Sequence, residues 1–251
     1  MDAFRDDRLA RTLVELAGTI AADIEHAVFP KVVTERVVEV LDVTAAGLML
    51  VDAGGTLSIA AWSDERVHQL QQHQLREREG PCLDCWTSGE PVSELLDGAG
   101  DGEPESRWPG FGAEARAAGF TSVHALPLRR RERTLGAICL FLERSGALDL
   151  ADVEAGQVIA DVTAIAIVQQ QAILEARARA AQLQAALDSR VVIEQAKGLL
   201  AGWTGVDVGR AFELLRAYAR NHNAELGEVA RQLVDGRLPA QAFVRRPLPP
   251  Q

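Results

Sequence analysis

A long stretch of helical sequence constrains the fold of this chain more than any other feature. From about residue 150 to Gly198 no proline interrupts the sequence, which predicts roughly 45 residues of continuous helix, longer than most globular helices. Apolar or alanine side chains fill all but one of the heptad positions counted from Ile159. The a positions are Ile159, Ala166, Ile173, Ala180 and Leu187, and the d positions are Val162, Gln169, Ala176 and Leu183.

This stripe needs a packing partner, and two partners remain open. Before Gln170, packing on the chain's own sheet and packing on a second helix are equally reasonable. Residues 175–185 have little sheet left to cover, so an exposed seam of alanine and leucine there favours pairing with a second helix. We therefore expect a coiled-coil linker over residues 171–186 and a parallel homodimer formed through the long helix.

The sequence ahead of this helix mixes helical and strand-like patterns. Helical spacing covers residues 7–27, 32–41 and 65–75. Two hairpins are predicted, one from strands at 45–51 and 57–62 and one from strands at 121–128 and 135–141, separated by a Gly/Pro-rich acidic stretch at 80–112. Because strands and helices do not alternate regularly, we expect an α+β fold, an antiparallel sheet with flanking helices.

The charge is unevenly distributed along the chain. The net charge of −10 argues against a nucleic-acid partner for the chain as a whole. Residues 1–182, however, hold 17 Lys+Arg against 29 Asp+Glu, whereas residues 183–251 hold 9 against 7. A slightly basic C-terminal part permits contact with RNA. The N-terminus lacks the apolar core of a signal peptide and no apolar run is long enough to span a membrane, so we expect a cytoplasmic protein without membrane contact.

Three short amphipathic helices are predicted after residue 187. On the first, Arg190 and Lys197 lie opposite the apolar face. Asp207 is placed to cap the second helix, on which Arg216 and Arg220 lie one turn apart and face away from the apolar side. Asn223 is placed to cap the third helix, and Gly236 and Pro239 follow its end.

Three motifs in this region resemble the ANTAR family of RNA-binding transcription antitermination regulators: ALDSRVVIEQAKGLL, AFELLRAYAR after Asp207, and NAELGEVARQLV. The resemblance spans about 55 residues. It implies a three-helix bundle that binds paired RNA hairpins in leader transcripts and stabilises an antiterminator, with dimerisation bringing two such bundles together. RNA loops expose bases that stack on aromatic rings, while Lys and Arg contact phosphates.

These properties make five side chains the candidate RNA-binding residues: Arg190, Lys197, Arg216, Arg220 and Tyr218. The alternative for the arginines is that Arg190 and Arg220 are solvated charges satisfied by Glu194 and Glu213. Tyr218 lies on the apolar side of its helix, where a tyrosine is more often part of the core.

The preceding part, residues 8–170, resembles a GAF domain in the order of its elements and in the segments GPCLDCWTSGEPV, GFTSVHALPL and LGAICLFL. GAF domains are commonly fused to ANTAR modules, and the resemblance implies a sensor with a small-molecule ligand that the sequence does not identify. Cofactors are not predicted.

Cys82 and Cys85 form a CxxC motif, a candidate redox pair or half of a metal site. Because no second pair of Cys or His ligands accompanies it, we predict no metal. With Cys139 as the third cysteine, reduced thiols are expected. The sequence contains no phosphate-binding glycine motif and no paired carboxylates, so we do not expect an enzyme.

Together these patterns predict four segments: a GAF-like sensor domain (1–170), the coiled-coil linker helix (171–186), an ANTAR RNA-binding domain (187–239) and a flexible tail (240–251). The favoured function is transcription antitermination under control of the sensor. The alternative is a ligand or redox sensor whose C-terminal helical bundle binds a protein partner.

Overall fold

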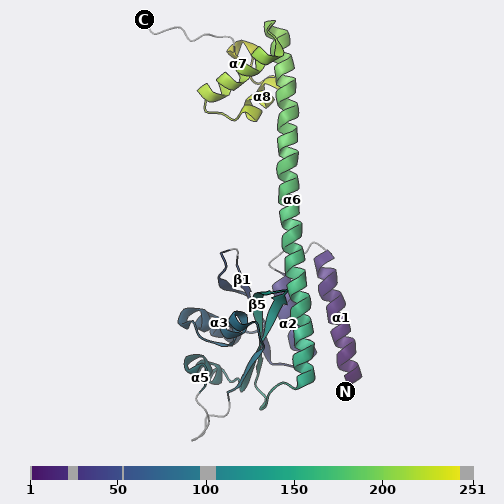
Figure 1. Ribbon diagram of the computed structural model, residues 1–251, viewed down its shortest axis with the longest axis vertical. Helices are drawn as coiled ribbons and strands as arrows, with labels where there is room; N and C mark the ends of the chain where they lie inside the picture. The colour runs from purple at the N-terminus through teal and green to yellow at the C-terminus, as the bar shows by residue number, and fades with distance from the viewer. Residues whose placement is uncertain (1, 22–27, 53, 97–105, 244–251) are drawn as a thin grey trace. The chain divides into compact units, whose positions relative to one another are not determined.

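The computed structural model describes residues 2–21, 28–52, 54–96 and 106–243 (Figure 1). It divides into two compact units, Met1–Ala172 and Ile173–Gln251, which are described separately below. One helix, α6 (Leu150–Thr204), contributes residues to both units.

The first unit contains a five-stranded antiparallel sheet with the strand order β2-β1-β5-β4-β3. The strands are β1 (Ala45–Val51), β2 (Leu57–Trp62), β3 (Val92–Leu95), β4 (Ser122–Arg130) and β5 (Arg133–Leu142). This sheet and its flanking helices confirm the predicted α+β class. Each predicted hairpin forms, β1 with β2 and β4 with β5.

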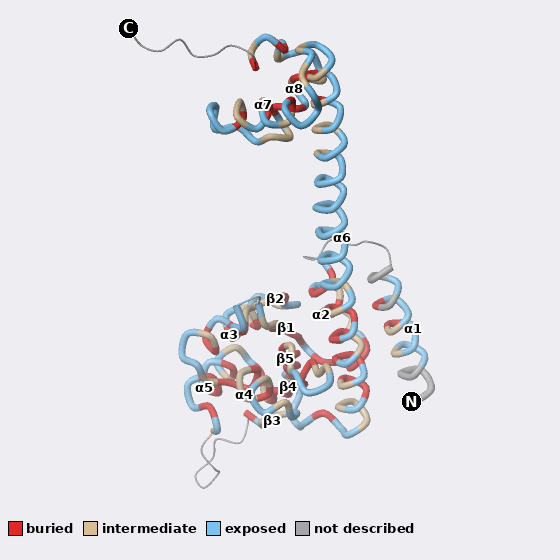
Figure 2. The backbone as a smooth tube through the Cα atoms, turned by 45° about the horizontal axis from the view of Figure 1, so that its top comes forward, coloured by how far each residue is buried: buried red, intermediate tan, exposed pale blue. Residues whose placement is uncertain are grey.

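Helices cover both faces of the sheet, and Figure 2 shows the buried residues between these layers. Alternate residues of the central strand β5 reach opposite cores, as strand geometry requires: Ile138 and Leu140 belong to one core, and Cys139 and Phe141 to the other. The first core is closed by α1 (Asp2–Ala21), α2 (Phe29–Leu41) and the beginning of α6. The second is closed by α3 (Glu65–Glu77), α4 (Pro81–Ser88) and α5 (Pro109–Ala117).

The stretch at 80–112 contains more regular structure than its composition predicted, since α4, β3 and the start of α5 all fall within it. Pro81 and Pro109 occupy first-turn positions of their helices, where a missing N–H costs nothing. Pro30 likewise lies in the first turn of α2, which begins at Phe29 rather than after the proline.

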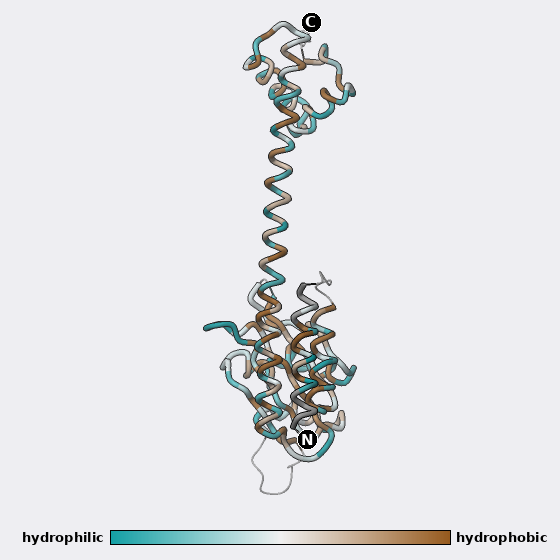
Figure 3. Tube along the Cα trace, turned by 90° about the vertical axis from the view of Figure 1, so that its right-hand side faces the viewer, coloured by the Kyte–Doolittle hydropathy of each residue, from teal (hydrophilic) through white to brown (hydrophobic). Residues whose placement is uncertain are grey.

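Only the first half of α6 packs on the chain's own sheet. Ile159 and Ala166 are buried in the core of the chain's own first unit, so this half of the stripe packs on the sheet. Every residue from 171 to 188 is exposed, and Figure 3 shows hydrophobic and hydrophilic residues alternating along this part of the helix. The helix continues beyond Gly198 and ends at Thr204, where Gly205 adopts a left-handed conformation (φ 71°).

The second unit is a small helical bundle around its own core. The end of α6, α7 (Val208–Asn221), α8 (Leu226–Val234) and a short 3-10 helix, η1 (Ala240–Phe243), surround Leu200, Leu215, Val229 and Leu233. Asp207 caps α7 as predicted, because its side chain accepts a hydrogen bond from the Arg210 backbone N at 3.0 Å.

Two predictions for this unit are wrong. Asn223 does not cap α8; it lies in the turn with φ 49°, and Glu225 is the N-cap residue. The predicted flexible tail also begins too early, because residues 240–243 form η1 and both Ala240 and Phe243 are buried in the bundle core. The rest of that segment, 244–251, lies outside the described residues.

None of the described helices combines the length and the hydropathy that a bilayer span requires.

Candidate nucleic-acid interface

Three of the predicted RNA-binding arginines are exposed in the second unit. Arg190 projects from α6, and Arg216 and Arg220 from α7. The described part of the chain places no carboxylate within 4 Å of their guanidinium groups, so the alternative pairings with Glu194 and Glu213 do not form. Solvated arginines without a partner can form bidentate hydrogen bonds with phosphate at little cost in lost protein contacts.

Lys197 has a different environment. Its ammonium group contacts both carboxylate oxygens of Glu194, at 2.9 and 2.8 Å, and lies 5.4 Å from the centre of the Phe212 ring. The side chain is 17% exposed. Because Phe212 belongs to α7, this contact brings the Lys197 side of α6 against the start of α7. A phosphate would have to compete with Glu194 for this lysine.

Tyr218 packs against the bundle core. Its ring stacks on His222 with 3.9 Å between ring centroids and meets Phe243 at 4.7 Å. With two aromatic neighbours already in place, the ring has less free area for a nucleobase than an exposed tyrosine would have. The structure therefore favours the core role that its position on the apolar side of α7 indicated.

The sequence prediction missed an exposed aromatic residue. Trp203, near the C-terminal end of α6, is 57% exposed, and Leu199 and Val208 on either side of it are also exposed. A large aromatic side chain in the last turn of the helix, directly after Gly202, was the available signal. Arg210 at the start of α7 is a further exposed cation of this unit.

The helices of this unit approach one another closely at Gly227 of α8. A Cβ atom at that position would lie 2.6 Å from the Ser189 hydroxyl oxygen of α6. Ser189 precedes Arg190, so this contact fixes the part of α6 from which Arg190 projects.

The cysteines of the first unit do not pair as the CxxC motif suggested. The disulfide joins Cys82 of α4 to Cys139 of β5, with their Cα atoms 6.3 Å apart. Cys85 is a free, buried thiol, and burial raises its pKa to about 12. The expectation of three reduced thiols is therefore wrong for two of them, because α4 packs directly on β5 and places Cys82 opposite Cys139. Among the described residues no group of three metal-ligating side chains occurs.

The chain thus combines an α+β domain with a small helical bundle that carries exposed arginines. Family models assign both parts. The GAF domain model matches residues 30–168, more than half of the chain, and the chain belongs to this family. The ANTAR domain model matches residues 181–234. Both GAF and ANTAR are regulatory domains.

A solved GAF domain structure shares the fold of the first unit. The GAF domain of a phosphoenolpyruvate-protein phosphotransferase from Acinetobacter is 13% identical, covers 69% of this chain and 98% of its own, and superposes with a TM-score of 0.50. The corresponding domain from Coxiella burnetii is 19% identical, with 69% and 97% coverage and a TM-score of 0.48. At such identities the likeness concerns the fold alone. A search of curated proteins found no match.

Proposed function

We propose that this chain is a transcription antitermination regulator that binds paired RNA hairpins through its ANTAR domain under control of its GAF domain. Arg216 and Arg220 of α7 and Arg190 of α6 contact the RNA phosphates first. Lys197 exchanges Glu194 for a phosphate, and Tyr218 keeps its packing position against the bundle core.

One observation carries this proposal: the segment matched by the ANTAR model holds five exposed arginines with no ion-pair partner among the described residues, and Arg190, Arg216 and Arg220 are three of them. Several described arginines elsewhere in the chain form ion pairs, as Arg66 does with Asp64 and Glu143. Cations left free in an acidic protein are suited to an external anion.

Titration of the full chain with a two-hairpin leader RNA from the native genome tests the proposal. Arg216→Gln combined with Arg220→Gln should weaken binding. The decrease of log affinity with log salt should also become shallower, by about 1 unit of slope for each lost phosphate contact. The matched control removes two exposed arginines of the first unit, Arg76→Gln and Arg144→Gln, and should leave the slope unchanged. Equal slopes for both variants, or no binding to any structured leader, would refute the RNA interface.

Dimerisation through α6 is part of this proposal. Ile173, Leu183 and Leu187 are 40%, 68% and 58% exposed, although they occupy a and d positions of the heptad pattern. A parallel pair of α6 helices would bury them and provide two ANTAR domains for two hairpins.

The alternative function, a sensor whose helical bundle binds a protein partner, is favoured by one observation. Leu199, Trp203 and Val208 expose apolar surface around the turn between α6 and α7, where phosphate recognition does not need it. Two results together would support this alternative. The Trp203→Ala variant would lose a protein partner that the parent chain binds, and the Arg216→Gln/Arg220→Gln variant would keep its affinity for RNA.

A further inference from the structure

The tip of the β4–β5 hairpin concentrates positive charge in the first unit. Arg129, Arg130, Arg131 and Arg133 lie within five residues of one another, interrupted only by Glu132. Arg129 forms an ion pair with Glu90 at 3.2 Å. Across the residues that the structure describes, no carboxylate lies within ion-pair distance of the other three arginines.

This arrangement has two local costs that other residue types at these positions would avoid. Arg130 lies directly opposite Arg133 in the strand register, and like charges in directly opposed positions destabilise a hairpin. Arg131 adopts a left-handed backbone conformation with φ 54°, which disfavours residues other than glycine and asparagine. Costs of this kind persist where a functional requirement selects for them.

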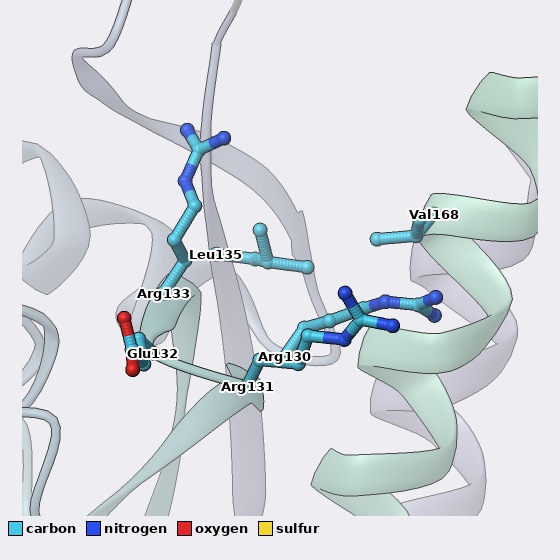
Figure 4. A pocket seen from close by; sticks show the side chains of 6 residues that line it. All are labelled: Arg130, Arg131, Glu132, Arg133, Leu135 and Val168. Carbon is cyan, nitrogen blue, oxygen red and sulfur yellow. The ribbon is translucent and has the colours of Figure 1, made fainter.

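A hollow of about 620 Å³ lies beside these arginines, within the size range of small-molecule sites. Its lining comes from the hairpin and from Val168 of α6. Figure 4 shows the Leu135 and Val168 side chains pointing toward one another across the hollow, while Arg130 and Arg131 extend toward α6. The hollow therefore combines apolar walls with a rim of three arginines and one carboxylate, that of Glu132.

We propose that this hollow binds a small phosphorylated molecule that also has an apolar body. The guanidinium groups of Arg130 and Arg131 would form charge-assisted hydrogen bonds with phosphate oxygens, which also relieves the repulsion between the arginines. The apolar part of the ligand would pack between Leu135 and Val168. An inorganic phosphate uses only the first of these contacts, and an uncharged apolar molecule only the second.

The site lies on α6 and not among the helices α3, α4 and α5 that cover the other face of the sheet. A ligand held there contacts the hairpin and Val168 together, at the part of α6 just before its exposed segment begins at residue 171. Binding is thereby coupled to the position of α6 on the sheet. This inference goes beyond the proposed RNA function and does not depend on it.

Calorimetric titration of the full chain with ATP, tripolyphosphate and adenosine tests the site, because these probes separate the anionic contact from the apolar one. ATP should bind more tightly than either partial probe. Arg130→Gln combined with Arg131→Gln should weaken ATP binding by at least about tenfold, since two charge-assisted contacts are lost. Val168→Glu, which places a carboxylate in the wall and keeps a good helix former, should weaken it as well.

The double variant Arg76→Gln with Arg144→Gln, which removes the same charge outside the hollow, is the matched control and should bind ATP like the parent chain. Hydrogen exchange locates the ligand: ATP should slow amide exchange at 129–135 and around Val168. Circular dichroism confirms that each variant keeps its fold.

Four results would overturn the proposal. In calorimetry these are undetectable binding of ATP and tripolyphosphate, equal affinity for both probes, and unchanged ATP affinity in the Arg130/Arg131 variant. In hydrogen exchange it is slowing of amide exchange by ATP that is confined to α3, α4 and α5. If the hairpin variant loses affinity for leader RNA while ATP binding persists, the arginines contact nucleic acid and the small-molecule site is wrong.

Discussion

His124 shows how a single buried residue makes the stability of the first unit depend on pH. The side chain lies on β4, is 4% exposed, and accepts a hydrogen bond at Nε2 from the backbone N of Leu148 at 3.2 Å. Burial, followed by the positive charge of Arg144, lowers the pKa of this imidazole below its ordinary value near 6.5. The folded chain therefore holds His124 neutral at a pH where the unfolded chain has begun to protonate it.

The direction of the effect follows from this difference in proton binding. Above about pH 6.5 both states hold a neutral imidazole and the contribution to stability is complete; as pH falls, the unfolded state binds the proton first and stability is lost down to the folded pKa. We expect the melting temperature to fall between about pH 7 and pH 5. The His124→Gln variant keeps a hydrogen-bond acceptor for the backbone N of Leu148, and its melting temperature should fall less steeply over this pH range. Identical pH dependence of the two melting temperatures would contradict this assignment.

At the scale of single residues, helix periodicity predicted which arginines are exposed, because the angular position of a side chain on a helix follows from sequence spacing. It did not predict the partners of Lys197. Glu194, three residues earlier, was visible as a neighbour on the same face, but the Phe212 contact depends on how α7 packs against α6. Nor could spacing show that Cys139, 57 residues away in the sequence, would face Cys82 more closely than Cys85 does.

At the scale of elements, prediction succeeded where the pattern was long or bounded by a clear turn. The limits of β1 and β2 match because apolar runs flank the Asp52 to Gly55 turn, in which the Asp52 carboxylate accepts hydrogen bonds from the backbone of Gly54 and Thr56. The short elements α4, β3 and α5 were missed because eight, four and nine residues display too little periodicity. Their existence depends on packing against the sheet.

The exposed seam of α6 yields a prediction about oligomeric state. Leu183→Glu combined with Leu187→Glu places charge at adjacent d and a positions, so a dimer observed by light scattering for the parent chain should become a monomer. Glutamate is a good helix former, so the helix itself should persist. The matched control, Ala181→Glu with Ala185→Glu, changes exposed positions outside the seam and should remain dimeric. A parent chain that is monomeric at every concentration would refute the seam, as would a dimer unaffected by the leucine substitutions.

At the scale of the whole chain, the apolar cores form two independent sets. All residues of the two cores of the first unit precede residue 168, and all residues of the bundle core follow residue 191. The residues of α6 between these cores are exposed from 171 to 188 and contribute to neither. The sequence predicted this division because the long helical pattern contains more residues than can pack on the sheet.

Separate cores predict two unfolding transitions in calorimetry of the full chain, because cooperativity requires shared packing. Leu215→Ala removes a fully buried side chain from the bundle core, which costs about 2–5 kcal/mol and should lower one transition by roughly 8 °C or more without moving the other. Leu126→Ala, equally buried in the first unit, should lower the second transition by roughly 4 °C or more. A single transition that shifts in both variants would show that α6 couples the two units into one folding unit.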